Sequence, residues 1–243
     1  MLDKKAFQAL SCGLCIVASE YQGKKAACVV NTLIQITSRP LRVLFTLNKE
    51  NYTSQLIRNS KTLSAVVLSE ETPLETIGLF GFQSSKKTDK FSECKFSYDI
   101  KGNPFIDDSI AARFCLVLSE VHDVGTHDLF ICDVVEAEYF PGQKAMTYDY
   151  YHRIKGGTTP KKASSFIDEE VIDKQTEKFA TGPLLHPSES IVEASENKTL
   201  RIGWRCKVCG YIEWVDELPD DYRCPICGVG KDKFELYTKY ELE

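Results

Sequence analysis

The sequence predicts a mainly β protein that carries a small metal-binding domain near its C-terminal end. Short apolar or β-branched runs, several of them alternating, recur between turn-forming residues, and this spacing favours an antiparallel barrel or sandwich. Two C-x-x-C pairs then follow one another closely, which is typical of a metal site. Strands are expected at residues 14–19, 27–36, 41–48, 63–69, 114–121 and 129–138.

Few helices are expected between these strands. Thr72-Pro73-Leu74-Glu75 is a capping box with proline at the first helical position, and it predicts a helix to about Phe80. A second short helix is expected after Tyr52-Thr53-Ser54. The sequence has no G-x-G-x-x-G and no long alternation of strands with helices, so a Rossmann nucleotide-binding domain is not expected.

Composition narrows the class of protein further. The chain has 243 residues, of which 43% are hydrophobic, and this fits one large domain with a small appendage. A net charge of −5 gives no case for binding nucleic acid or an acidic membrane. We expect no membrane span and no secretory signal, because no apolar run is long enough. The ten cysteines, four of them in tight pairs, favour a metal over disulfides and a cytoplasmic location.

Changes in composition along the chain predict three parts. Residues 1–160 form the large domain, residues 161–202 are a polar linker, and residues 203–243 form the metal domain. A short helix over Asp168–Phe179 is expected within the linker. Residues 204–243 hold 6 basic and 9 acidic side chains, a net charge of −3, so we expect the metal domain to be a mobile acidic head.

The candidate metal ligands are Cys206, Cys209, Cys224 and Cys227. Two C-x-x-C pairs with this separation can place four thiolates tetrahedrally around either iron or zinc. The glycine after each pair permits a turn that points backbone N–H groups at the sulfurs, and such hydrogen bonds tune redox potential. The module is also acidic and rich in aromatic residues, which favours iron, although the spacing alone suits zinc as well.

The C-terminal segment resembles a rubredoxin in its C-x-x-C-G-Y, its C-P-x-C-G and the following Lys231–Glu235. The loop between the pairs is shorter than in ordinary rubredoxins and is more similar to the abbreviated module at the tail of rubrerythrins. The resemblance implies one Fe(Cys)₄ centre, but the short loop makes the redox potential hard to predict. A structural zinc ribbon is the alternative.

Residues 1–160 resemble the flavin reductase family, and the resemblance rests on stretches that occur in order along the domain. These stretches are Val30–Pro40, Asn48–Thr53, Gly78–Phe82, Asp89–Phe91, Gly125–Phe130 and Tyr148–Gly156. The resemblance implies an FMN-binding split β-barrel that is usually a homodimer. From chemistry alone, the serine- and lysine-rich loop after Gly81 also has the hydroxyl and ammonium groups that a phosphate requires, although a cluster of this kind is more often a solvated turn.

Site residues follow from this resemblance by position. Four side chains are expected along the isoalloxazine ring and ribityl chain of FMN: Asn31, Thr32, Thr46 and Asn48. Four more are expected at the phosphate: Ser84 and Lys90 as ligands, with Thr53 and Phe91 nearby. His127 is the catalytic candidate on the side where the nicotinamide enters, or else a strand-start histidine bonded to backbone. The pair Tyr150-Tyr151 either covers the flavin or fills a dimer interface.

The remaining cysteines are not expected to carry chemistry. Cys12 and Cys15 form a C-x-x-C, but residues three apart in a strand point to opposite faces. Four others are most simply small buried hydrophobes: Cys28, Cys94, Cys115 and Cys132.

The order of the two domains resembles the high-molecular-weight rubredoxins of anaerobic bacteria. This implies electron transfer from NADH or NADPH through FMN to the iron centre, and on to a flavodiiron protein that reduces nitric oxide or oxygen. A hydride carries two electrons and one iron takes one, so a flavin beside the iron acts as a converter. Three alternatives remain: a plain flavin reductase with a structural zinc tail, a flavoredoxin-like carrier without NADH activity, and a zinc-ribbon binding module.

Overall fold

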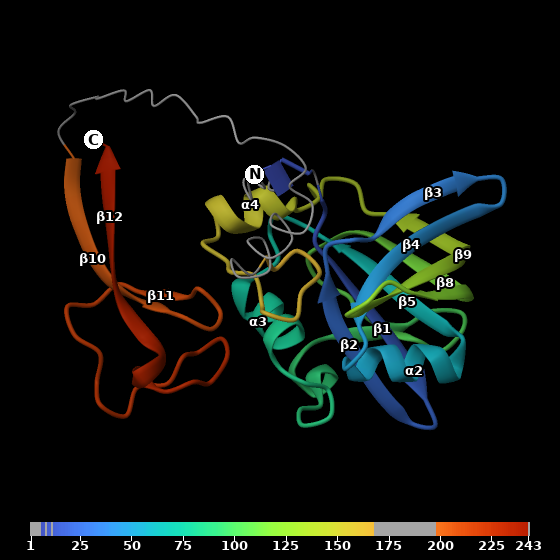
Figure 1. The fold of residues 1–243 in the computed structure, drawn as a ribbon, viewed down its shortest axis with the longest axis horizontal. Coiled ribbons are helices and arrows are strands. Elements are labelled where there is room, and N and C mark those ends of the chain that lie inside the picture. Colours follow the sequence, from blue (N-terminus) through green and yellow to red (C-terminus); the bar gives the residue numbers. More distant parts are fainter. Residues whose placement is uncertain (1–5, 8, 11, 168–197, 243) are drawn as a thin grey trace, which may run out of the picture.

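The computed structural model describes residues 6–7, 9–10, 12–167 and 198–242, and most of its regular structure is β (Figure 1). A seven-stranded antiparallel sheet has the strand order β2-β1-β5-β8-β9-β4-β3. Its strands are β1 (Cys15–Tyr21), β2 (Lys24–Val30), β3 (Ile34–Ser38), β4 (Leu41–Asn48), β5 (Thr62–Leu68), β8 (Ile110–Asp123) and β9 (His127–Tyr139). A small hairpin pairs β6 (Phe96–Tyr98) with β7 (Pro104–Ile106).

Each strand expected from the sequence is present, with one difference. The apolar run at residues 27–36 is not one strand, because the chain leaves the sheet after Val30 and enters β3 only at Ile34. Asn31 lies in this break, where its side chain is free to turn toward a cavity. The sequence could not reveal the break, since apolar residues continue on both sides of it.

The short helices are α2 (Tyr52–Ser60), α3 (Leu74–Phe82) and α4 (Tyr148–Arg153), with 3₁₀ turns at Lys90–Glu93 and Lys231–Lys233. The two helices expected from the sequence are α2 and α3. The capping box predicted for α3 does not form, because the Thr72 hydroxyl donates to the Ser109 carbonyl at 2.7 Å. In α2 the cap is Asn51, whose side-chain oxygen accepts from the Thr53 N–H at 3.0 Å.

Two apolar cores hold the large domain together. One lies inside the barrel, where Phe45 and Phe130 stack with ring centroids 5.1 Å apart. The other includes Phe80 of α3 and Tyr151 of α4. The predicted burial of isolated cysteines is confirmed at Cys28, Cys115 and Cys132, whereas Cys94 is only partly buried.

The metal domain is a three-stranded sheet of order β11-β10-β12, formed by β10 (Lys198–Cys206), β11 (Ile212–Glu213) and β12 (Phe234–Leu242). Its core contains Leu218, Ile226 and Phe234 together with the four cysteines. Glu213 accepts hydrogen bonds from the hydroxyls of Tyr211 at 2.9 Å and Tyr222 at 2.5 Å. These bonds hold two of the module's aromatic residues beside the metal site.

Residues 161–167, the beginning of the predicted linker, lie against the large domain. The rest of that linker up to residue 197, with the helix expected over Asp168–Phe179, lies outside the described residues.

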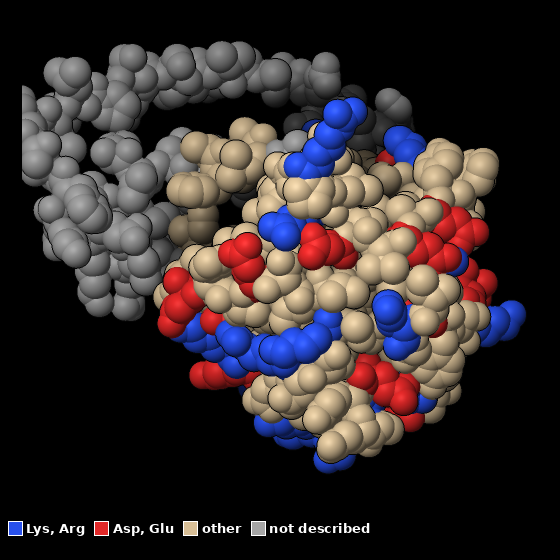
Figure 2. All heavy atoms as spheres, turned by 90° about the vertical axis from the view of Figure 1, so that its right-hand side faces the viewer, with Lys and Arg blue, Asp and Glu red and all other residues tan. Residues whose placement is uncertain are grey.

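Charges on the barrel are mixed in sign. Figure 2 shows acidic and basic side chains interspersed over the face that lies on the right in Figure 1. On the strands, Arg42 pairs with Asp133 at 2.7 Å, and Arg113 pairs with both Glu136 and Glu138. Among the described residues, no helix is long and apolar enough to cross a membrane.

Candidate functional site

The four paired cysteines meet at one point, as the sequence predicts. Their sulfurs all lie within 4.8 Å of one another, with Sγ–Sγ distances of 3.6 Å for Cys206–Cys227 and 3.5 Å for Cys209–Cys224. Four sulfurs about 2.3 Å from one metal ion would be about 3.8 Å apart in a tetrahedron. The site therefore fits one tetrahedrally bound metal ion.

Backbone N–H groups surround the sulfurs in the way the glycine turns predict. Gly210 and Gly228 have φ values of +81° and +74°, and their N–H groups bond the carbonyls of Cys206 and Cys224 at 2.9 Å. Desolvation, the largest single influence, raises the pKa of Cys206. Backbone N–H bonds from Cys209 and Val208, together with the thiols of Cys209 and Cys227, act against it and lower the pKa below its ordinary value. Donors of this kind stabilise a thiolate and tune the redox potential of a bound iron.

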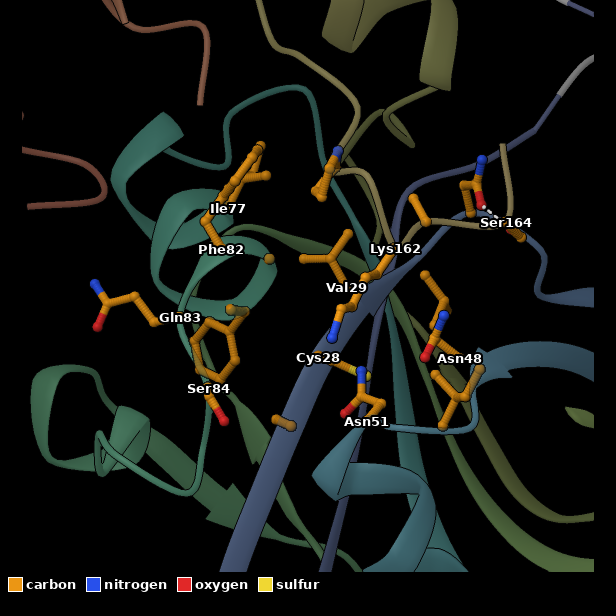
Figure 3. Close-up of a pocket in the computed structure, with 18 of the residues that line it drawn as sticks. Cys28, Val29, Asn48, Asn51, Ile77, Phe82, Gln83, Ser84, Lys162 and Ser164 are labelled. Carbon is orange, nitrogen blue, oxygen red and sulfur yellow. Dashed lines mark hydrogen bonds between the residues drawn. The ribbon is translucent and has the colours of Figure 1, made fainter. Parts of the chain in front are cut away.

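A second site lies in the large domain as a cavity of about 270 Å³. It is bordered by β2, the end of β4, the start of α2, helix α3 and residues 158–164. Figure 3 shows Asn48, Asn51 and Ser164 on one side and Phe82, Gln83 and Ser84 on the other, with Cys28 and Val29 of β2 between them. The lining thus combines amide and hydroxyl groups with apolar walls, which suits a ligand that has a flat ring and a polar tail.

Six of the nine predicted flavin-site residues line this cavity: Asn31, Thr46, Asn48, Ser84, Lys90 and His127. The other three, Thr32, Thr53 and Phe91, are not part of its lining. Thr32 supports Thr46 from the side, since its hydroxyl accepts from the Thr46 N–H at 2.9 Å. Phe91 packs between Phe80 and Phe96, and Thr53 is 1% exposed in α2.

Lys90 is buried at the edge of the cavity, and its ammonium group is firmly held. Its Nζ donates to the carbonyls of Ala27 at 2.8 Å and Phe80 at 2.9 Å, which leaves one of its three N–H donors. Desolvation lowers the pKa of Lys90 to about 8. Within the part of the chain that the structure describes, Lys90 forms no ion pair, and a buried cation of this kind suits an anionic group in the cavity.

His127 begins β9 and lies opposite Asn48 in the sheet. Its Nδ1 is 2.8 Å from the Thr126 hydroxyl, and its Nε2 is 3.1 Å from the Lys162 carbonyl. The structure therefore gives this histidine a backbone partner and also a place in the wall of the cavity.

Residues 158–164 close one side of the cavity, a role that the sequence does not predict. Ser164 donates to the Asn31 side-chain oxygen at 3.1 Å, and Lys162 forms an ion pair with Glu50. Tyr151 also lines the cavity, whereas Tyr150 packs against the apolar core. A polar segment that follows a domain has no periodicity to indicate burial, so its contacts could be found only in three dimensions.

A barrel with a mixed polar and apolar cavity, joined to a buried four-sulfur site, defines a two-centre redox protein. The flavin reductase like domain matches residues 7–158, and the rubrerythrin, rubredoxin-like domain matches residues 204–235. The chain belongs to the flavin reductase family and ends in a rubredoxin-like domain.

Individual relatives agree with this assignment. A high molecular weight rubredoxin of Moorella thermoacetica is 32% identical over 96% of this chain and 99% of its own length. A ferric-chelate reductase (NAD(P)H) of Archaeoglobus fulgidus is 36% identical over 70% of this chain and all of its own length. The crystal structure of a putative flavin reductase from Haemophilus somnus superposes with a TM-score of 0.55 at 21% identity, covering 60% of this chain and 91% of that one.

These matches confirm the predicted fold class, the resemblance to high-molecular-weight rubredoxins and the assignment as an oxidoreductase. They also confirm the predicted cofactors, FMN for the flavin reductase domain and one iron for the four-cysteine centre. NAD(P)H is the electron donor that the reductase relatives indicate.

Proposed function

We propose that this chain passes electrons from NADH or NADPH through FMN to its iron centre and then to a flavodiiron protein that reduces nitric oxide or oxygen. The observation that carries the first part is the presence of a flavin-sized cavity and a four-sulfur site in one chain. NAD(P)H supplies two electrons together, and one iron accepts one electron at a time. FMN supplies the chemistry that connects the two.

The cavity suggests how FMN is held. Asn31, Thr46 and Asn48 present polar atoms on one side, where they would bond the ring and the ribityl chain. Ser84 and Lys90 would hold the phosphate at the other end. The three predicted residues outside the lining would act indirectly, by holding residues or elements that border the cavity. Thr32 would fix Thr46, Thr53 would fix α2, and Phe91 would fix the segment that carries Lys90.

His127 would face the nicotinamide. It lies on the wall formed with residues 158–164, so the nicotinamide would reach the ring from this side. The proposed role is to position the nicotinamide, since hydride transfer requires no general base from the protein.

Rapid mixing under anaerobic conditions tests the pathway. With one NADH or NADPH per chain, the flavin band should bleach first and the ferric band second, and flavodiiron protein added together with nitric oxide should then restore both. The acidic module, with a net charge of −3, should make the last step faster at low ionic strength than at high. An iron band that stays oxidised while the flavin is reduced would contradict the proposal.

A flavin reductase with a structural zinc tail is the second candidate, because four thiolates bind zinc with the same geometry. Metal analysis with a visible spectrum separates the two functions. Stoichiometric zinc in protein produced with ample iron, without a ferric band, would establish the zinc alternative.

We also propose that the chain forms a homodimer. The β3–β4 hairpin exposes Ile34, Ile36 and Leu41, with 51%, 40% and 46% of their surface accessible. An edge strand that exposes several apolar side chains is usually buried in an interface with another protein chain. Sedimentation analysis should show a dimer, and Ile36→Lys should shift it toward the monomer; a wild-type monomer would contradict the proposal.

A further inference from the structure

The iron module meets the large domain through the two turns that carry its metal ligands. The first, Cys206–Gly210, lies against residues 156–158, where the Thr158 hydroxyl donates to the Val208 carbonyl at 3.4 Å. The second, Cys224–Gly228, lies against helix α3. The sequence suggests that this module is a mobile head. In the structure it instead packs against the flavin domain, with its metal-binding end toward that domain.

The contact at α3 depends on a glycine. A Cβ at Gly78 would lie 1.9 Å from Cγ2 of Ile226 and 3.2 Å from its carbonyl oxygen. Glycine is disfavoured inside a helix, so its presence there indicates a need for close approach. Ile226 stands between Cys224 and Cys227 and is only 3% exposed. An apolar side chain at the tip of a metal-binding turn thus fills a notch in the flavin domain.

The contact at residues 156–158 leads directly from the cavity to the metal ligands. Tyr151 lines the cavity, and its hydroxyl donates to the Thr158 carbonyl at 3.1 Å. A Cβ at Gly210, next to Cys209, would lie 2.6 Å from Thr158 Cγ2 and 2.7 Å from the Gly156 carbonyl. Helix α3 connects the cavity and the iron module in a similar way. Its residues Ile77 and Phe82 line the cavity. On the side of the iron module, Gly78 contacts Ile226, and Phe82 packs against the core of the module.

We propose that Gly78 and residues 156–158 form the docking site at which the iron module of the same chain receives electrons from the flavin. Gly78 and Ile226 are positioning residues of this site. When bound, FMN would take the hydride of NADH together with one proton from solvent, and NAD⁺ would leave. The iron held by the four cysteines would take the two electrons one at a time, with release of two protons to solvent, so two iron turnovers would balance one NADH. This inference rests on the proposed function.

Gly78→Ala tests the notch with the full-length protein. The added methyl should push Ile226 and the module away from α3, while iron and FMN contents stay at their wild-type values. A shift of about 1 Å in reacting groups can change a rate by about 100-fold. We therefore expect iron reduction to slow by about tenfold or more, with flavin reduction by NADH unchanged. Gly13→Ala is the matched control, since its Cβ would meet only the Met146 carbonyl oxygen, at 3.9 Å.

A compensating change separates docking from damage to the fold. Ile226→Ala removes the Cγ2 atom that the new methyl meets, so the double variant Gly78→Ala with Ile226→Ala should reduce its iron faster than Gly78→Ala alone. Equal rates in the wild type and in Gly78→Ala would overturn the proposal, as would a double variant no faster than Gly78→Ala alone.

A second measurement needs no electron transfer. Hydrogen exchange on the zinc-loaded protein should show protected amides in α3 and residues 224–228 of the wild type, and faster exchange in both segments of Gly78→Ala. Unchanged exchange would overturn the docking site even if iron reduction slowed for another reason. If NADH fails to reduce iron in the wild type while the exchange result holds, the proposed function fails and the docking site stands.

Discussion

The four sulfurs of the iron module come from two stretches of four residues, Cys206–Cys209 and Cys224–Cys227, whereas the lining of the flavin cavity extends along the chain from Leu14 to Ser164. Each C-x-x-C pair is organised by its own turn, so the sequence positions are enough to identify all four ligands. The cavity depends on the packing of β2, β4, α2 and α3, and a residue one position away can face the other side. A site whose residues lie within short stretches of sequence can therefore be predicted from their spacing. A site whose residues come from distant parts of the chain can be identified only from the three-dimensional fold.

The largest expected effect is the loss of the iron site in Cys209→Ala. Metal binding and folding are coupled in so small a module, so iron should fall from about one per chain to nearly none and the module should unfold. FMN binding should stay within about threefold of the wild type, because every residue that lines the flavin cavity belongs to the large domain. Metal analysis and flavin titration measure both effects.

Cys12→Ala is the matched control, because Cys12 lies outside the metal site and the flavin cavity. It should keep its iron. Stoichiometric iron in Cys209→Ala would show that Cys209 is not a metal ligand and that the prediction of the ligands from the C-x-x-C spacing is wrong.

Removal of the module tests whether the flavin site stands alone. A protein that ends at Phe166 should bind FMN and oxidise NADH but should not reduce a flavodiiron acceptor. It should fold, since it keeps all of residues 7–158, which the flavin reductase like domain matches. If the truncated protein reduces the acceptor as fast as the full-length protein does, the iron centre does not lie on the electron-transfer pathway.

A shorter protein that ends at Lys162 gives a finer comparison. It lacks Ser164 and its bond to Asn31, so FMN should bind more weakly than in the protein that ends at Phe166, by about 1 kcal/mol. Equal affinities would mean that residues 163–166 do not support the flavin.

Lys90→Met should weaken FMN binding by about 1.5–3 kcal/mol, because it removes a charged donor at the proposed phosphate site. Flavin titration measures the loss. Lys86→Met changes an exposed lysine of the same loop and should have a smaller effect. If the two variants bind FMN equally well, the phosphate lies elsewhere.

The pH dependence of the same lysine has a definite sign. In the flavin-free protein its pKa is lowered to about 8 by burial, below its value in the unfolded chain. The unfolded chain therefore binds more protons above pH 8, and the free energy of unfolding should rise with pH from about 8 to about 10.5. The bound phosphate should raise the pKa of Lys90, so FMN affinity should be highest below pH 8, fall as pH rises from about 8 to the raised value, and level off above it. Lys90→Met should lack both trends in urea unfolding and flavin titration.

The smallest effect is expected for Thr32→Val. This change leaves the Thr46 N–H without its 2.9 Å acceptor and should lower the free energy of unfolding by about 1 kcal/mol. FMN affinity should change less than in Asn31→Ala, because Asn31 lines the cavity and Thr32 does not. If flavin titration shows a larger loss of FMN affinity for Thr32→Val than for Asn31→Ala, Thr32 contacts the flavin directly.

Several features of this protein were predictable from the sequence alone. The strand positions follow from alternating apolar residues, and the metal ligands from two turns with glycine. Helices α2 and α3 are predictable near their observed positions, although the capping box predicted for α3 does not form. Each of these depends on interactions within a few residues of the chain. Six of the nine candidate flavin-site residues also line the cavity, because the family resemblance carries information about the fold.

Only the tertiary structure decided which polar side chains face the cavity. Thr32 and Thr46 lie on neighbouring segments, yet only Thr46 lines it. The roles of Ser164 and Gly78 likewise arise from partners 133 and 148 positions away, Asn31 and Ile226. Such contacts exist only once the barrel has closed and the iron module has packed on α3, since no local pattern links residues so far apart.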